Sequence, residues 1–147
     1  MKNFRNDQER KARIQQAIAH LRALPEFADC TEDDFTDLAR TGTATAMPSQ
    51  WAFLLESTPA DAAYLVVNGT AKVFKHGVAI ATVAVGDVVG ETGLLNHTLR
   101  NATVSSVSAL KALRIDKVNW AALMARRPQL RQAFQDVAAA RIAAIPA

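Results

Sequence analysis

The sequence predicts a mainly β domain with flanking helices (α+β): an antiparallel jelly-roll-like β-barrel, two N-terminal helices and two C-terminal helices. Apolar residues recur at helical spacing near both ends of the chain. Short β-prone segments separated by turn residues fill the middle. The chain has 147 residues, half of them hydrophobic, which suits a single domain with a substantial core.

The first expected helix covers residues 6–24. Asn6 is placed to cap it, with Glu9 three residues later, and Pro25 ends it. Its apolar stripe is formed by Ile14, Ala17, Ile18, Leu21 and Leu24.

A second helix is expected to begin after Thr31, with Asp34 at the capping-box position, and to end at Gly42. Its apolar face is supplied by Phe35, Leu38 and Ala39.

Seven strands are expected in the middle of the chain. Asn68-Gly69 and His76-Gly77 are tight-turn signals, so residues 64–83 are predicted to form an antiparallel meander. The expected strands cover residues 43–47, 51–55, 64–67, 71–75, 78–83, 102–107 and 109–115.

The last two helices are predicted from caps and apolar spacing. Asp116 caps the first, Pro128 opens the second, and Pro146 ends it. The expected apolar residues are Val118, Trp120, Leu123 and Met124, followed by Leu130, Phe134, Val137, Arg141 and Ile145.

One domain is therefore expected over residues 1–147. It divides into N-terminal helices (1–42), a β-roll (43–115) and C-terminal helices (116–147). With no apolar run near the ~20 residues of a membrane span and no secretory signal, we expect a cytoplasmic protein without membrane contact.

The net charge of +3 is spread along the chain, with a local cluster at Arg5, Arg10, Lys11 and Arg13. We interpret this cluster as the solvated face of a helix, and contact with nucleic acid or an acidic partner is the less favoured alternative. The single cysteine, Cys30, excludes a disulfide framework and a multi-cysteine zinc site.

Residues 86–104 carry the expected functional site. Small residues around Gly90 let a backbone approach a ligand, and Arg100 can grip phosphate oxygens bidentately. Glu91 would repel a phosphate unless it served another part of the ligand, such as sugar hydroxyls. A phosphate joined to a sugar suggests a nucleotide. The alternative is an internal ion pair between the two charges.

This stretch resembles the phosphate-binding cassette of cyclic nucleotide-binding domains, found in catabolite-activator-type regulators, kinase regulatory subunits and gated channels. The resemblance rests on Gly90-Glu91-Thr92-Gly93-Leu94-Leu95, followed after a short spacer by Arg100-Asn101-Ala102. Upstream, Tyr64, Val66 and Gly69 match the family's Tyr-x-Val-x-x-Gly. Thr92 and Leu99 depart from its usual aliphatic residue and proline.

The resemblance implies the role of each site residue. Arg100 would pair with the cyclic phosphate, and Glu91 would accept a hydrogen bond from the ribose 2′-hydroxyl. The implied ligand contacts are Val88, Val89, Gly90, Glu91, Thr92, Arg100, Asn101 and Ala102, with backbone N–H groups of Thr92 and Ala102 reaching the phosphate.

The last helix usually closes over the base in such domains. Its candidates for a base lid are Phe134, Val137 and Arg141, and core packing or dimer contact is the alternative. A homodimer is left open.

The implied function is that of a cytoplasmic receptor for cAMP or cGMP. No DNA-binding domain is expected, and ligand binding would reposition the C-terminal helices and signal to a protein partner. The ligand would be the cyclic mononucleotide, with no cofactor, no metal and no nucleic acid. A ligand-independent adaptor on the same fold is the alternative.

An enzyme is the third hypothesis, and it is disfavoured. A cupin-type metal site would need clustered histidines, but His20, His76 and His97 are scattered, and no hydrolytic triad is visible. No catalytic residue is therefore expected.

Overall fold

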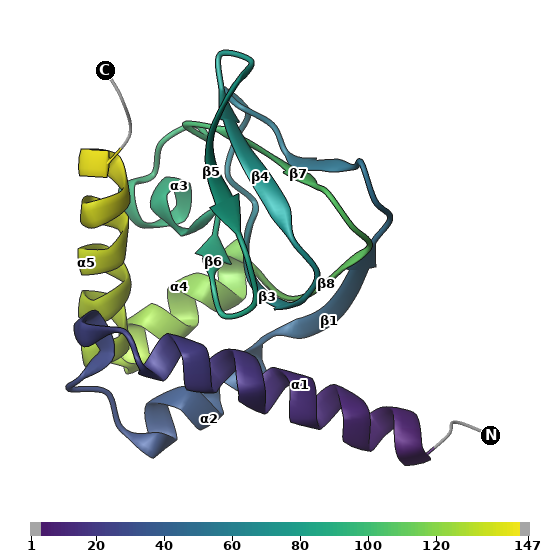
Figure 1. Cartoon of the computed structure of the whole chain (residues 1–147). Helices are drawn as coiled ribbons and strands as arrows, with labels where there is room; N and C mark the ends of the chain where they lie inside the picture. The colour runs from purple at the N-terminus through teal and green to yellow at the C-terminus, as the bar shows by residue number, and fades with distance from the viewer. Residues whose placement is uncertain (1–3, 145–147) are drawn as a thin grey trace.

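The computed structural model describes residues 4–144, with side chains described for 7–140. Two four-stranded antiparallel sheets pack face to face, and the helices cover the outer face of one of them (Figure 1). The first sheet has the strand order β1-β8-β3-β6, and the second has the order β2-β7-β4-β5. The sheets are not closed into a barrel, so the expected barrel is corrected to an open pair of sheets.

The elements follow the predicted order of helices, strands and helices. The helices are α1 (Phe4–Arg22), η1 (Pro25–Phe27), α2 (Glu32–Thr41), α3 (Glu91–Asn96), α4 (Lys117–Arg126) and α5 (Pro128–Ala144). The strands are β1 (Thr43–Met47), β2 (Ala52–Leu54), β3 (Ala62–Asn68), β4 (Ala71–Lys75), β5 (Val78–Val83), β6 (Val88–Val89), β7 (Thr103–Ser106) and β8 (Leu110–Asp116).

Two of the predicted helix starts are confirmed. The Thr31 hydroxyl accepts from the Asp34 N–H while the Asp34 carboxylate accepts from the Thr31 N–H, a complete capping box. Asp116 caps α4 by accepting from the Asn119 N–H at 2.8 Å.

The start of the first helix was predicted wrongly. α1 begins at Phe4, so Asn6 lies inside it and is not its cap. The predicted stop at Pro146 lies outside the described residues.

The predicted meander is wrong at its first turn. β3 pairs with β6 and β8, and β4 pairs with β5 and β7, so the Asn68-Gly69 corner carries the chain between the sheets. Gly69 has φ +93°, and a Cβ there would lie 2.5 Å from the Ala109 carbonyl oxygen. The second turn, at His76-Gly77, does join β4 to β5 as a hairpin.

Strand alternation divides the core into two parts. Along β3, Ala62, Tyr64 and Val66 face the space between the sheets. Ala63 and Leu65 face the helices. β3 is therefore buried on both faces, which explains its nearly continuous apolar sequence.

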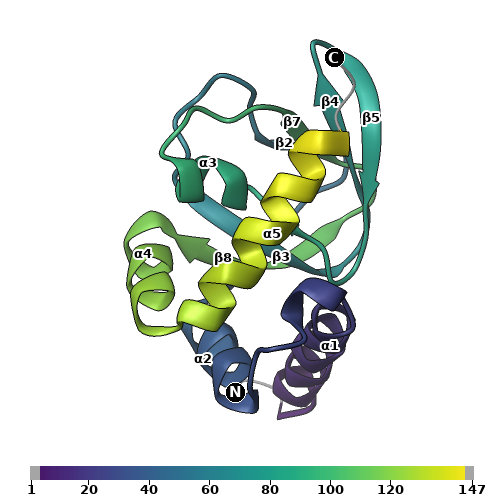
Figure 2. The same cartoon turned by 90° about the vertical axis from the view of Figure 1, so that its left-hand side faces the viewer.

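The helical part of the core is built around Phe134 of α5. Its ring packs edge-on against Phe27 of η1, with centroids 5.1 Å apart, and against Trp120 of α4 at 4.9 Å. Figure 2 shows α5 crossing in front of β8 and β3, with α4 beside it and α1 and α2 below it. These three rings join both ends of the chain.

Candidate functional site

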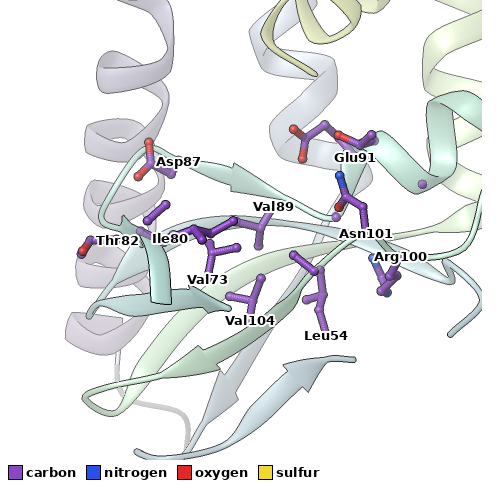
Figure 3. A pocket seen from close by; sticks show the side chains of 16 residues that line it. Leu54, Val73, Ile80, Thr82, Asp87, Val89, Glu91, Arg100, Asn101 and Val104 are labelled. Carbon is purple, nitrogen blue, oxygen red and sulfur yellow. The ribbon is translucent and has the colours of Figure 1, made fainter. Parts of the chain in front are cut away.

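A pocket of about 270 Å³ lies between the second sheet and the segment that follows β6 (Figure 3). Its apolar side chains come from β2, β4, β5, β6 and β7, whereas its charged groups lie before α3 (Asp87), at its first residue (Glu91) and after it (Arg100). The lining consists of Leu54, Val73, Ile80, Ala81, Thr82, Val83, Asp87, Val89, Gly90, Glu91, Thr92, Gly93, Arg100, Asn101, Ala102 and Val104.

Arg100 lies almost completely buried at one end of this pocket, with 6% of the residue exposed. Its backbone is fixed by two hydrogen bonds of 2.8 Å, from the Arg100 N–H to Thr58 and from the Ser57 N–H to Arg100. The side chain enters from the loop after α3, and the carbonyl of Ala62, the first residue of β3, helps to hold it. A buried guanidinium is costly unless its N–H groups find acceptors.

One half of the guanidinium is satisfied within the protein. Nη2 donates to the Asp61 carboxylate at 2.8 Å and to the Ala62 carbonyl at 2.9 Å. Nη1 is also buried, and among the described residues it has no acceptor. The protein therefore holds Arg100 in place and leaves N–H donors for an anion.

Gly90 allows this close approach. It caps the start of α3 with φ +86°. A Cβ at this position would lie 2.8 Å from Arg100 Nη1 and 2.9 Å from the Ala62 carbonyl oxygen. Both the backbone conformation and the space therefore require glycine.

Glu91 is fully buried as the first residue of α3, and it lines the pocket. Figure 3 shows Glu91, Asn101 and Arg100 at one end of the pocket and Asp87, Ile80 and Thr82 at the other. Valines occupy the middle (Figure 3), so a long apolar wall separates the end that carries Arg100 and Glu91 from the end that carries Asp87. This is the pattern of a small-molecule site with a few orienting polar groups.

Most of the residues named from the sequence come together here. Seven line the pocket: Val89, Gly90, Glu91, Thr92, Arg100, Asn101 and Ala102. Val88 does not, because adjacent strand residues point to opposite faces and Val88 packs in the helical core. The structure therefore places Val88 outside the pocket lining, and its expected role as a wall of the ribose stays a prediction.

The proposed base lid does not reach the pocket in this structure. Phe134 is fully buried and Val137 is 9% exposed, both in the helical core, and neither lines the cavity. The side chain of Arg141 lies outside the described residues. A lid role for these residues stays a prediction about another arrangement of α5.

Sequence reasoning missed the second sheet's contribution and Asp61. Floor residues such as Leu54 and Val73 are separated from the cassette in sequence and meet it only through strand pairing. Asp61 lies 39 residues before Arg100 and gives no local signal of their contact.

Other chemistry finds little support in the part of the chain that is described. Within it, no three His, Cys, Asp or Glu side chains are grouped to hold a metal ion. None of its helices is both long and apolar enough to cross a bilayer. Burial raises the pKa of the Cys30 thiol to about 11, with Asp34 and Asp29 adding to the effect, so the thiol is protonated at neutral pH.

Comparisons with known proteins agree on the family. The model of the cyclic nucleotide-binding domain matches residues 52–127. The cAMP-dependent protein kinase regulatory subunit of Yarrowia lipolytica is 33% identical over 106 residues, which is 71% of this chain and 28% of that protein. The corresponding subunit of Schizosaccharomyces pombe is 39% identical over 62 residues, 42% of this chain and 15% of that protein. The chain thus spans less than a third of either relative.

Solved structures show the same fold. The regulatory domain of Toxoplasma gondii PKA, crystallised with cAMP, superposes with a TM-score of 0.73 at 16% identity, covering 92% of this chain and 51% of that one. The catabolite activator protein of Thermus thermophilus gives 0.71 at 23% identity, covering 81% and 58%. The family match covers the second sheet, the pocket and α4, and on this ground the chain belongs to the cyclic nucleotide-binding domain family.

Proposed function

We propose that this chain is a receptor for a cyclic mononucleotide, with cAMP as the first candidate. The observation that carries the proposal is the buried Arg100 guanidinium, anchored by Asp61 through Nη2 while Nη1 has no acceptor among the described residues. An exocyclic phosphate oxygen would supply that acceptor in a site shielded from water. The relatives named as cAMP-dependent kinase regulatory subunits favour cAMP.

The remaining site roles follow from this placement of the phosphate. Glu91 would accept from the ribose 2′-hydroxyl, and the N–H groups of Thr92 and Ala102 would reach phosphate oxygens. Val89 would contact the ribose, and Asn101 would lie beside the phosphate or base. The base would lie along the apolar wall formed by Val73 and Ile80.

Binding would be passed to the helices through residues on the back of the site. Val88 and Leu94 flank Gly90 and Glu91, and both pack in the same core as α4 and α5. We therefore infer that ligand repositions the C-terminal helices and that a protein partner reads the change. A regulatory role without catalysis and a cytoplasmic location are part of the same proposal.

Isothermal titration with cAMP, cGMP and a cyclic dinucleotide tests the receptor function. Arg100→Ala should weaken cyclic mononucleotide binding by at least about a hundredfold, because it removes a buried charge-assisted contact. Arg114→Ala is the matched control: Arg114 also lies near Asp61, at 3.7 Å, but does not line the pocket. Its affinity should stay close to that of the unchanged chain.

Glu91→Gln should weaken binding less, and mainly for ligands with a free 2′-hydroxyl. At ~1 mM ligand, titration detects binding free energies near -4 kcal/mol. If the unchanged chain gave no heat at that concentration, the receptor function would be excluded and the ligand-independent adaptor favoured. Equal loss in the Arg100 and Arg114 variants would mean that Arg100 acts through the fold alone.

A further inference from the structure

A second cavity, of about 370 Å³, lies between α1 and the first sheet, on the side away from the nucleotide pocket. α1 supplies Arg10, Arg13 and Ile14, and the sheet supplies β1 together with Lys111 and Leu113 of β8. Nothing in the proposed receptor function uses this groove. Figure 1 shows why it exists: the N-terminal half of α1 runs past the sheet beside β1 and is not covered by another element.

The groove is basic, and its cations are available. Arg10, Arg13 and Lys111 line it, against one acidic side chain, Glu9. Among the described residues, none of the three cations takes part in a salt bridge or side-chain hydrogen bond, whereas Arg22, Arg126 and Arg127 on neighbouring helical segments are all paired. Three cations converging on one hollow favour an anionic occupant.

β1 offers an open backbone edge beside these charges. It is the terminal strand of its sheet, and its ladder partner is β8. Within the part of the chain that the structure describes, no hydrogen bond joins the backbone of residues 43–47 to a segment on the free side of β1. Its sequence, Thr-Ala-Thr-Ala-Met, has no charge, no proline and no bulge, which are the usual protections of an edge.

Small side chains leave room for an added strand. Ala44 and Ala46 are exposed and line the groove, and Leu113 and Ile14 form apolar contacts at its base. An extended peptide beside β1 would complete the backbone hydrogen bonds, and alternate side chains would reach the cations. A lipid headgroup or a nucleic acid backbone would satisfy the charges but not the strand edge.

We propose that this groove binds an extended acidic segment of a partner protein, added as a strand to the free edge of β1. The edge supplies backbone hydrogen bonds, and Arg10, Arg13 and Lys111 select carboxylate side chains on one face of the segment.

A labelled twelve-residue peptide alternating Glu and Thr is the probe, with fluorescence anisotropy and amide NMR shifts as readouts. Binding should perturb the amides of residues 43–47. A peptide of the same sequence with every backbone nitrogen methylated should bind at least about tenfold more weakly, since it has no N–H group to give to a ladder.

Charge-reversal variants of the groove provide a second test of the proposal. Arg10→Glu with Arg13→Glu should weaken the Glu-Thr peptide at least about tenfold, by like-charge repulsion. Lys11→Glu is the matched control, because Lys11 is exposed on the same helix and does not line the groove. Circular dichroism of each variant checks that α1 still forms.

Equal affinity for the two peptides, an equal effect of Lys11→Glu, or amide shifts outside β1 and α1 would overturn the proposal. So would binding of phosphatidylserine vesicles or single-stranded RNA through these cations without binding of the Glu-Thr peptide. None of these outcomes depends on nucleotide binding, so the groove and the receptor function succeed or fail separately.

Discussion

The position of the Arg100 guanidinium depends on the absence of a Cβ atom at Gly90. Arg100 Nη1 can approach the backbone of residue 90 this closely because residue 90 has no Cβ, and the left-handed φ of +86° turns the chain into α3 at that point. The same turn brings Glu91 into the cavity. A single glycine therefore sets both the position of the cation and the direction of the carboxylate.

Gly90→Ala is expected to abolish tight nucleotide binding and to lower the free energy of unfolding by roughly 1–3 kcal/mol. The added Cβ would meet Arg100 Nη1 and the Ala62 carbonyl oxygen, each closer than 3.0 Å. Titration calorimetry gives the affinity, and urea denaturation gives the stability.

The variant Gly77→Ala distinguishes the effect of a strained backbone φ from the effect of a Cβ that crowds Arg100. Gly77 also has a positive φ, +79°, but a Cβ there would meet nothing within 4 Å. This variant should lose stability by about 1–2 kcal/mol and keep its affinity. If it lost affinity as Gly90→Ala does, crowding at Arg100 would not be the cause.

The end of the site that carries Arg100 and Glu91 could be predicted from the sequence, because residues 90–102 form a compact motif of small and charged residues suited to binding a phosphate. The sequence could not locate the apolar wall. Val73 and Val104 are ordinary strand residues, and their place opposite the motif depends on which strands pair. The Asp61 anchor was missed for the same reason, since contacts between distant loops leave no periodicity to read.

At the level of elements, an ion-pair cluster joins α2 to the junction of α4 and α5. Arg126 binds the Asp37 carboxylate through Nε at 2.7 Å and Nη2 at 2.9 Å. Arg127 donates to the same carboxylate at 2.9 Å. These bonds fix the last two helices to the N-terminal ones where the chain bends.

Asp37 should make stability depend on pH in the acid range. Hydrogen bonds from Arg126, opposed by burial and supported by Arg127, hold the pKa of Asp37 well below its ordinary value of 3.8. The folded state therefore binds this proton less readily than the unfolded state. The stabilisation is present above pH 3.8 and is lost as the pH falls below it.

Asp37→Asn is expected to lower the free energy of unfolding by about 1 kcal/mol near pH 7, with a smaller difference near pH 3. Urea denaturation at both pH values measures it. Asp33→Asn removes a charge from an exposed position on the same helix and should change stability by less than about 0.5 kcal/mol. If the difference in free energy of unfolding between Asp37→Asn and the unchanged chain grew as the pH fell, the assignment of this pH dependence to Asp37 would be wrong.

Local signals predicted the starts of α2 and α4 but not that of α1, where Asn6 lies inside the helix, and they did not predict which strands pair. The Thr31-Asp34 pair and Asp116 predict helix starts because their side chains can cap a helix, and both starts are confirmed. The Asn68-Gly69 pair predicts only that the chain turns. Whether the next strand pairs with β3 or crosses to the other sheet is set by burial on both faces of β3, a property of the assembled fold.

Across the whole molecule, the site borders both parts of the core. β6 divides its two residues between them, with Val89 lining the pocket and Val88 packed among the helices. Trp120 of α4 lies in the same core against Phe134 of α5. A shift of the cassette on ligand binding would therefore change the surroundings of Trp120.

Tryptophan fluorescence can report this shift, because the chain has two tryptophans in opposite environments. Trp51 is 56% exposed and Trp120 is 3% exposed. In a Trp51→Phe protein the emission comes from Trp120 alone. Saturating cAMP should change its intensity and maximum, and hydrogen exchange in α4 and α5 should change in parallel.

The control is the same background with Arg100→Ala, in which cAMP should leave the emission of Trp120 unchanged. Heat of binding in the Trp51→Phe protein with constant emission and constant exchange would show a receptor whose helices stay fixed. The two measurements together separate binding from its transmission, because Arg100 lines the pocket whereas Trp120 packs in the helical core and does not line it.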